Sequence, residues 1–462
     1  MLRALFVAAI LAYGCAKSLK GPFYALLLYL WLAYFRPESW LWFDFVSQLD
    51  LSFFVGVFIL LATLMSSDKV RFGFGPALIL IFLMHSLVST LQSRYFDYSW
   101  PFWMQFAKQA VISLAIVTLV NTEERLRITL TVIAASLALE ATKQGWAQLI
   151  LNPGAKNDNS HPVFGDNNGV AVGMLMLVAI LIALGRITEK RWEKLLTRFA
   201  AVGVIYRGLS TYSRGGFLSC GALGLHYVLR SKRKTVGILA IAAVSLAIVP
   251  VLPTAFWNRI ATIDDAAESD PLAANGPDAS VQGRLHFWKV AVIMANDRPV
   301  LGVGHQAYEA AYDDYDPSEG QYGTRRAVHS SWMGVLAELG YVGLFLFVLI
   351  ICNAFVACFR AQRLAKRDPS LQNLGKMAMA IEGALVVYCV GGTFLSHQYL
   401  ELHWHMLALS MVVDRLVRER VAAAVETAPH STRATAAAAW SGRAAIPAAF
   451  RAAGPINRPT HP

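Results

Sequence analysis

Residues Gly169 to Gly185 read GVAVGMLMLVAILIALG, a run without one charged side chain. A helix that crosses a bilayer needs about 20 consecutive, mainly apolar residues, and runs of helical length recur along most of the chain. Hydrophobic residues make up 56% of the 462 positions and charged residues 15%, against about 25% charged in ordinary soluble domains. We therefore expect an all-α, polytopic membrane protein. The composition excludes a soluble enzyme, a disordered chain and a nucleic-acid binder, despite the net charge of +11.

The apolar runs divide the chain into four parts. The candidate spans are Leu51–Ser66, Gly73–Thr90, Trp103–Val120, Leu126–Leu151, Gly169–Gly185, Phe199–Tyr212, Gly215–Arg230, Thr235–Pro250, His329–Phe359, Lys376–Ser396 and Leu402–Val417. Leu2–Phe35 forms either one broken span or two short ones, because Lys17, Lys20, Gly21 and Pro22 interrupt it. We thus expect N-terminal transmembrane helices (1–250), a large loop (251–328), C-terminal transmembrane helices (329–417) and a disordered, Ala-rich cytoplasmic tail (418–462).

The basic residues predict the orientation. Four short segments concentrate Lys and Arg, at residues 69–71, 186–198, 230–234 and 360–376, and all fall on one side of the expected spans. Lys and Arg in short loops favour the cytoplasmic side. The large loop falls on the opposite side and carries eleven acidic against six basic residues, a net −5. Within it, Arg284–Asn296 has apolar residues at helical spacing and predicts an amphipathic helix.

Three residues on the acidic side are candidates for chemistry. Arg214 follows Ser213 and precedes two glycines, Arg284 opens the amphipathic helix, and His329 opens a span. Each has an ordinary reading as a snorkelling or solvated arginine or a polar helix start. Together they suit group transfer from a phosphate-linked donor, since guanidinium groups match phosphate oxygens and a neutral imidazole accepts protons. The glycines after Arg214 would leave room for close approach of a phosphate.

These segments resemble one family. Ser213-Arg214-Gly215, Gly283-Arg284, the turn Pro299–Gly304 and His329-Ser330-Ser331 with Glu338-Leu339-Gly340 are similar to motifs of the O-antigen ligases. The opening Lys20-Gly21-Pro22 to Glu38 resembles the subgroup of exosortase-associated O-glycosylation ligases. The resemblance implies a bacterial inner-membrane glycosyltransferase of GT-C type, with about twelve spans, a large periplasmic loop and a site that faces the periplasm.

The resemblance also implies roles and partners. The donor would be a glycan on undecaprenyl pyrophosphate, and the acceptor the lipid A-core of lipopolysaccharide, with membrane lipids around the chain. Arg214 and Arg284 would hold the pyrophosphate, and His329 would be the catalytic base, with inversion at the anomeric carbon and no cofactor. A polymerase or a protein O-oligosaccharyltransferase would use the same donor with another acceptor. A flippase for the lipid-linked glycan is the alternative from another class, and Arg207 is its best intramembrane charge.

Other residues form a second tier. Arg325 and Arg326 precede His329 by about one helical turn, so they either extend the phosphate cradle or balance the acidic loop. Asp166 and Asn168 belong to a loop that resembles a family motif, and His397 lines an acceptor cleft or simply packs at the interface. Asp314-Tyr315-Asp316 has the pattern of a metal-binding acidic pair, but its spacing is generic, so we expect no metal.

Overall fold

The computed structural model of the chain describes residues 2–40, 51–65, 71–239, 242 and 277–427, and all statements below concern these residues. They form helices and short 3₁₀ turns, with no strand among them. The helices are α1 (Leu2–Ser18), α2 (Pro22–Phe35), α3 (Pro37–Trp40), α5 (Leu51–Met65), α6 (Phe74–Leu91), α7 (Phe96–Leu119), α8 (Glu123–Leu151), α9 (Asn167–Ile187), α10 (Arg191–Leu209), α11 (Arg214–Arg230), α14 (Pro277–Asp297), α15 (Tyr308–Tyr315), α16 (Ser331–Ala365), α17 (Gln372–Gly391) and α18 (Glu401–Glu426).

The all-helical, membrane-type fold is confirmed, with fewer clear spans than the sequence predicts. Within the described residues, five helical segments are long and apolar enough to cross a membrane: α6, α7, α9, α16, and α17 with its flanking 3₁₀ turns (Pro369–Phe394). The other candidate spans form shorter or more polar helices, such as α10, whose first turn is charged. Most of the expected span Thr235–Pro250 lies outside the described residues.

Near both ends of the chain, the helix boundaries in the structure are more definite than, or differ from, the expected ones. The opening stretch is two helices, α1 and α2, separated at Leu19–Gly21, because Gly21 has a φ of 149° and Pro22 starts the next helix. At the other end, α18 continues to Glu426, past residue 418 where we expected the tail to begin. The rest of that predicted tail lies outside the described residues.

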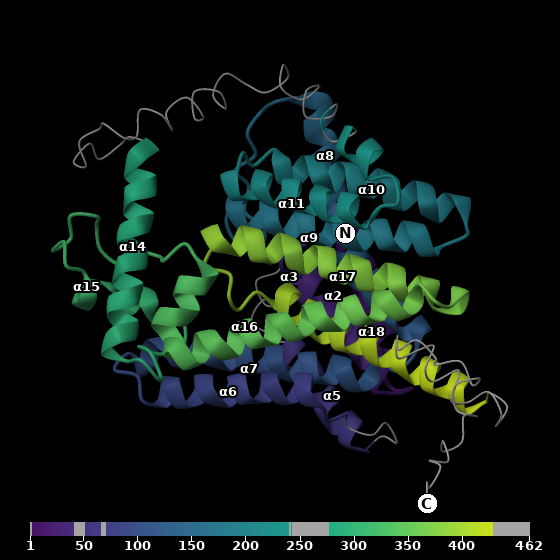
Figure 1. The fold of residues 1–462 in the computed structure, drawn as a ribbon, viewed down its shortest axis with the longest axis horizontal. Helices are drawn as coiled ribbons and strands as arrows, with labels where there is room; N and C mark the ends of the chain where they lie inside the picture. Colours follow the sequence, from purple (N-terminus) through teal and green to yellow (C-terminus); the bar gives the residue numbers. More distant parts are fainter. Residues whose placement is uncertain (1, 41–50, 66–70, 240–241, 243–276, 428–462) are drawn as a thin grey trace, which may run out of the picture.

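Helix α9, which contains the run Gly169–Gly185, lies at the centre of one half of the bundle. It packs against α8, α10, α11 and α17, and Figure 1 shows it among these helices. Most of its residues are buried on every face, as expected for a helix that is apolar all round. Its sequence therefore reflects burial inside the protein as much as exposure to lipid.

The basic segments meet at one end of the bundle. Arg71 pairs with Glu419 near the end of α18, and Lys376 Nζ donates to the carbonyl of Arg186. At the same end, Arg230 pairs with Glu382 of α17. The basic segments that the topology prediction placed on one side therefore lie together in space. This supports one common orientation for them.

The described part of the large loop forms a small unit at the opposite end. Helix α14 lies across the ends of the long helices, and α15 lies beside it (Figure 1). The residues Arg284–Asn296, for which we predicted a helix, fall within α14. Phe287 and Met294 of α14 share a small apolar cluster with Tyr308 and Tyr312 of α15. The loop thus has a hydrophobic core of its own over the bundle.

Candidate functional site

The base of the site is a break in α16. Gly340 has a φ of 69°, a left-handed conformation that interrupts the helix. The segment Pro299–Gly304 inserts there. The N–H groups of Val303 and Gly304 donate to the carbonyls of Ala337 and Glu338, and the N–H of Tyr341 donates to the carbonyl of Pro299, at 2.8–3.0 Å. Backbone groups freed inside a membrane helix need such partners, so these two motifs form one interlocked structure.

The glycines of this interlock allow the backbones to touch. A Cβ on Gly302 would lie 2.4 Å from the carbonyl carbon of Glu338, and one on Gly340 would lie 2.5 Å from the Pro299 oxygen. From α6, Ser89 Oγ lies within hydrogen-bonding distance of the carbonyls of Leu301 and Glu338, and His85 hydrogen-bonds the carbonyl of Leu339. The start of α16 is therefore held by these contacts to the segment Pro299–Gly304 of the large loop and to α6.

His329 lies directly before this fixed segment. Its φ is 49°, an uncommon value for a residue other than glycine. Its N–H donates to Ser396 Oγ at 3.0 Å, and its ring lies 6.4 Å from that of Phe287 in α14, between ring centroids. Ser330 caps α16 by accepting from the N–H of Met333. The backbone thus holds the half-buried imidazole between the start of α16 and α14.

Arg214 and Arg284 come together from elements 70 positions apart in the sequence. Arg214 is the first residue of α11 and is exposed, whereas Arg284 lies in α14 and is half-buried. Burial, and then the positive charge of Arg214, lower the pKa of Arg284. Two guanidinium groups within electrostatic range favour an anion between them. The two arginines of the predicted pair are therefore close enough for the charge of Arg214 to act on Arg284.

The glycines after Arg214 have a different role from the one that the sequence suggested. A Cβ on Gly216 would lie 2.7 Å from the Cβ of Ala171 in α9, and one on Gly215 would meet Phe394 at 3.5 Å. Both glycines are buried. They let α11 pack closely on α9 and the segment before α18, so they face protein and leave no open room for a phosphate.

Burial and nearby charged residues shift the pKa of His329. Burial lowers its pKa, the charge of Arg284 lowers it further, and Asp166 opposes this. The imidazole is therefore neutral at pH 7 and able to accept a proton. Of the residues predicted from the motifs, Arg284 and Asp166 thus act on His329 directly, while Arg214 acts on Arg284.

Asp166, Asn168 and His397 belong to one local structure. Asp166 caps α9 by accepting from the N–H of Gly169 at 2.8 Å, and Asn168 Nδ2 donates to the same carboxylate. His397 Nε2 hydrogen-bonds the carbonyl of Phe164 at 3.0 Å. These contacts fix the loop before α9 to the segment before α18. They give Asp166 and Asn168 a structural role, while Asp166 also acts on His329 through its charge.

Arg325 and Arg326 lie on the exposed side of the site. The N–H of Arg325 donates to Asp313 Oδ1, and Arg326 Nε donates to the carbonyl of Tyr322. The charge of Arg326 is close enough to lower the pKa of His329, after the larger effects of burial and Arg284. Arg326 therefore adds positive charge at the rim, whereas the backbone of Arg325 is tied to the acidic loop.

The acidic pair Asp314 and Asp316 contacts protein groups in two different places. Asp314 accepts from Tyr95 Oη and lies 3.5 Å from Arg94 Nη1. Asp316 lies 2.7 Å from His286 Nε2 and accepts from the N–H groups of Ser318 and Gly320. These carboxylates join loop segments. Across the described residues, no three His, Cys, Asp or Glu side chains come together as a metal site.

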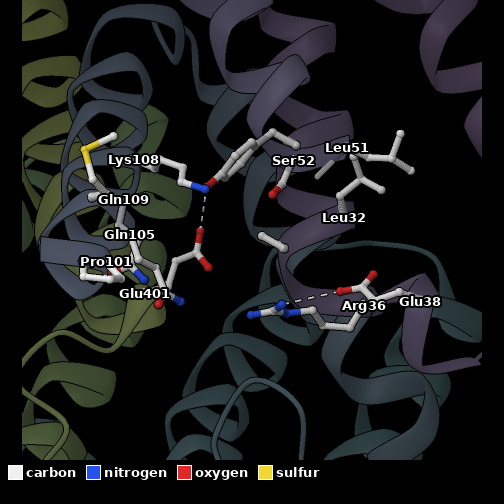
Figure 2. A pocket seen from close by; sticks show the side chains of 13 residues that line it. Leu32, Arg36, Glu38, Leu51, Ser52, Pro101, Gln105, Lys108, Gln109 and Glu401 are labelled. Carbon is white, nitrogen blue, oxygen red and sulfur yellow. Dashed lines mark hydrogen bonds and ion pairs between the residues drawn. The ribbon is translucent and has the colours of Figure 1, made fainter. Parts of the chain in front are cut away.

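A polar cavity lies next to the backbone of His329, and His397, which the sequence suggested for the lining of an acceptor cleft, is among its lining residues. Two adjoining hollows, of about 470 and 390 Å³, share Arg36, Gln105, Gln109 and Glu401 as lining residues, and we call them together the inner cavity. Figure 2 shows Arg36 and Glu401 on facing walls, with Gln105 and Gln109 on α7 nearby.

The second hollow extends to two residues next to His329. Val328 and Ser396 line it, and both adjoin His329, one in sequence and the other by the hydrogen bond to its N–H. Glu338 also lines it and accepts from Gln398 Nε2 and Tyr399 Oη at 3.0 and 2.8 Å. The sequence singled out Glu338 as part of a motif without assigning it a role. The pair Gln105 and Gln109, four residues apart in an apolar helix, was the available signal for the cavity.

Comparisons with known proteins show which families parts of this chain resemble. The model of the O-antigen ligase family matches residues 199–348, which include Arg214, Arg284 and His329. A second model, for a family of unknown function, matches residues 2–185. The exopolysaccharide production protein ExoQ of Rhizobium meliloti (strain 1021) is 23% identical over 141 residues.

That similarity covers 28% of this chain and 28% of the length of ExoQ. It is therefore a partial relative, and it shares with this chain less than a third of its length. The family match over 199–348 spans the segments whose motifs suggested the resemblance. The resemblance of this chain to the O-antigen ligase family is thereby confirmed.

Proposed function

We propose that this protein transfers a glycan from undecaprenyl pyrophosphate to an acceptor hydroxyl at the outer end of the bundle. The acceptor hydroxyl gives its proton to the neutral imidazole of His329, and its oxygen attacks the anomeric carbon. The bond from that carbon to the pyrophosphate oxygen breaks, and undecaprenyl pyrophosphate leaves with the electron pair. Arg214 and Arg284 hold the negative charge that develops on the leaving group. A single displacement inverts the anomeric carbon, and the step needs no metal or other cofactor.

One observation carries this proposal. Arg214, Arg284 and His329 come from α11, α14 and the segment before α16, and, after burial, the charge of Arg214 lowers the pKa of Arg284, as the charge of Arg284 lowers that of His329. A pair of cations beside a neutral base suits an anionic leaving group and a hydroxyl nucleophile. A flippase would need no base. Arg207, the best charge for that alternative, is bound to Gln144 and to the carbonyl of Asn159, so it holds a loop in place.

The family favours the lipid A-core as the acceptor, in the bacterial inner membrane with the site towards the periplasm. The basic segments at the other end support this orientation, because such segments favour the cytoplasm. A second candidate is polymerisation, in which the acceptor is another lipid-linked glycan. The partial similarity to a protein named for exopolysaccharide production favours that candidate. A protein acceptor is the third possibility, from the subgroup resemblance.

Reconstitution of the purified chain tests the proposal. The chain in liposomes receives undecaprenyl-pyrophosphate glycan together with rough lipopolysaccharide, with a second glycan carrier, or with a candidate secreted protein. We expect glycan transfer to rough lipopolysaccharide and release of undecaprenyl pyrophosphate. Movement of the intact lipid-linked glycan across the bilayer, without transfer to any acceptor, would contradict the proposal and support the flippase.

A further inference from the structure

The inner cavity contains buried polar atoms that the protein leaves without partners. Gln109 and Gln398 are 9% and 3% exposed, and the Oε1 atom of each makes no hydrogen bond within the described part of the chain. Arg36 Nε and His397 Nδ1 are in the same state. All four residues line the cavity. Buried polar atoms in folded proteins nearly always have partners, so four of them within the walls of one hollow make it a candidate binding site.

The chemistry of the walls indicates which kind of ligand fits. The charged lining residues are Arg36, Lys108, Glu38, Glu309, Glu338 and Glu401. Four carboxyl groups and two cations offer no excess of positive charge for an anion such as a pyrophosphate. The amide groups of Gln105, Gln109 and Gln398 both donate and accept, as do hydroxyl groups. Tyr98 and Phe102 add aromatic surface. This mixture matches an uncharged molecule that carries many hydroxyls.

The position of the cavity indicates what this molecule does. It reaches Val328 and Ser396 beside His329, whereas Arg214 and Arg284 line neither hollow. The two arginines and the cavity are therefore separate, and the cavity extends to residues next to the backbone of His329. A hydroxyl nucleophile that gives its proton to His329 would have to approach from such a place.

We propose that the inner cavity is the binding site for the acceptor, and that it holds a sugar whose hydroxyl faces His329. This inference rests on the proposed transfer reaction and names the substrate class for one of its two sides. Gln109 and Gln105 on α7, with Gln398 before α18, hydrogen-bond the sugar hydroxyls. They act as binding residues and take no part in the proton transfer. The cavity would then favour a sugar acceptor over a protein segment.

Binding measurements on the full chain in detergent test this site. The probes are the delipidated core oligosaccharide of rough lipopolysaccharide, an oligosaccharide of the glycan repeat, and inorganic pyrophosphate for the donor side. The variants are Gln109→Met and Gln105→Met, which remove side-chain amides that hold no other structure together. Ser113→Ala is the matched control, because Ser113 is buried on the same helix, bonds only the carbonyl of Gln109 and does not line the cavity.

We expect each glutamine variant to weaken binding of one oligosaccharide by about tenfold, as for the loss of one or two hydrogen bonds. Pyrophosphate binding should not change, and in transfer assays KM for the acceptor should rise more than kcat falls. Arg284→Ala should do the reverse, with weaker pyrophosphate binding and unchanged sugar binding. If neither oligosaccharide binds to the wild type, or if both glutamine variants bind as well as Ser113→Ala, the cavity holds only water and the inference is wrong. Sugar binding in the cavity without any transfer would instead overturn the proposed reaction and leave the binding site in place.

Discussion

The two ends of the bundle use arginine in opposite ways. At the basic end, Arg360 donates two hydrogen bonds to the carboxylate of Asp414, at 2.7 and 2.9 Å, and Arg418 bonds the same group. At the outer end, the charge that acts on Arg284 belongs to another arginine, Arg214. Arginine beside carboxylate fastens helices to each other, whereas the positive charge of Arg214 acts against that of Arg284. The difference separates arginines that hold helices together from those that we propose bind the donor.

The largest expected effect is on His329. General-base help is typically worth about 10²–10⁴-fold in rate, so His329→Ala should reduce transfer by that factor while donor binding persists. The measurement is the rate of glycan transfer per folded protein. The control is His226→Ala at the basic end, where the ring hydrogen-bonds a backbone carbonyl and packs against Tyr227, and it should transfer normally. A folded His329→Ala protein with near-normal transfer would contradict the role of His329 as the general base.

The arginine pair should give the next largest effect. Arg214→Ala or Arg284→Ala removes charge-assisted hydrogen bonds worth about 1.5–3 kcal/mol each, so donor affinity should fall about 10- to 100-fold. Lysine at either position should restore only part of it, since an ammonium lacks the bidentate fork. Binding of the lipid-linked donor to each purified variant measures this. Undiminished affinity in both alanine variants would mean that the pyrophosphate lies elsewhere.

Removal of a paired arginine should have a smaller effect and of another kind. Arg360→Ala deprives the buried carboxylate of Asp414 of its bidentate partner and leaves Arg418. We expect a loss of about 1–3 kcal/mol in stability, seen as a lower Tm in detergent, with donor affinity unchanged in the folded fraction. The comparison between the two ends breaks down if Arg360→Ala weakens donor binding as much as Arg284→Ala does.

The smallest expected effect is a shift in pH dependence. Because burial and Arg284 lower the pKa of His329, the transfer rate should rise with pH and reach its plateau below neutrality if chemistry limits turnover. Arg284→Gln removes a positive charge, so the pKa rises and the profile moves to higher pH. Asp166→Asn removes a negative charge and should move it to lower pH. Arg284→Lys keeps the charge and serves as the control. Identical profiles in all four proteins would show that His329 does not titrate in the step measured.

The residues differ in how far the sequence could predict them. Helices α9 and α16 were predictable from apolar runs, and topology and motif resemblance predicted Arg214, Arg284 and His329 as one site, which stays a prediction. Beyond the suggestion that His397 lines a cleft, the inner cavity was not predictable, because its polar residues come from several helices and their proximity depends on packing. The expectation that Gly215 and Gly216 leave room for a phosphate was wrong for a related reason. A glycine permits the close approach of either a ligand or a helix, and only the position of Ala171 decides between them.

The interlock at Gly340 also has a consequence for biogenesis. Residues 299–304 leave the ribosome before residue 340 does, and they satisfy the carbonyls of Ala337 and Glu338 that the break in α16 exposes. The partner of the bend is therefore already synthesised when α16 enters the bilayer. A chain cut between these segments would have to insert α16 as a straight helix and bend it later. The loop segment 299–304 and helix α16 therefore assemble together, in the order in which they are translated.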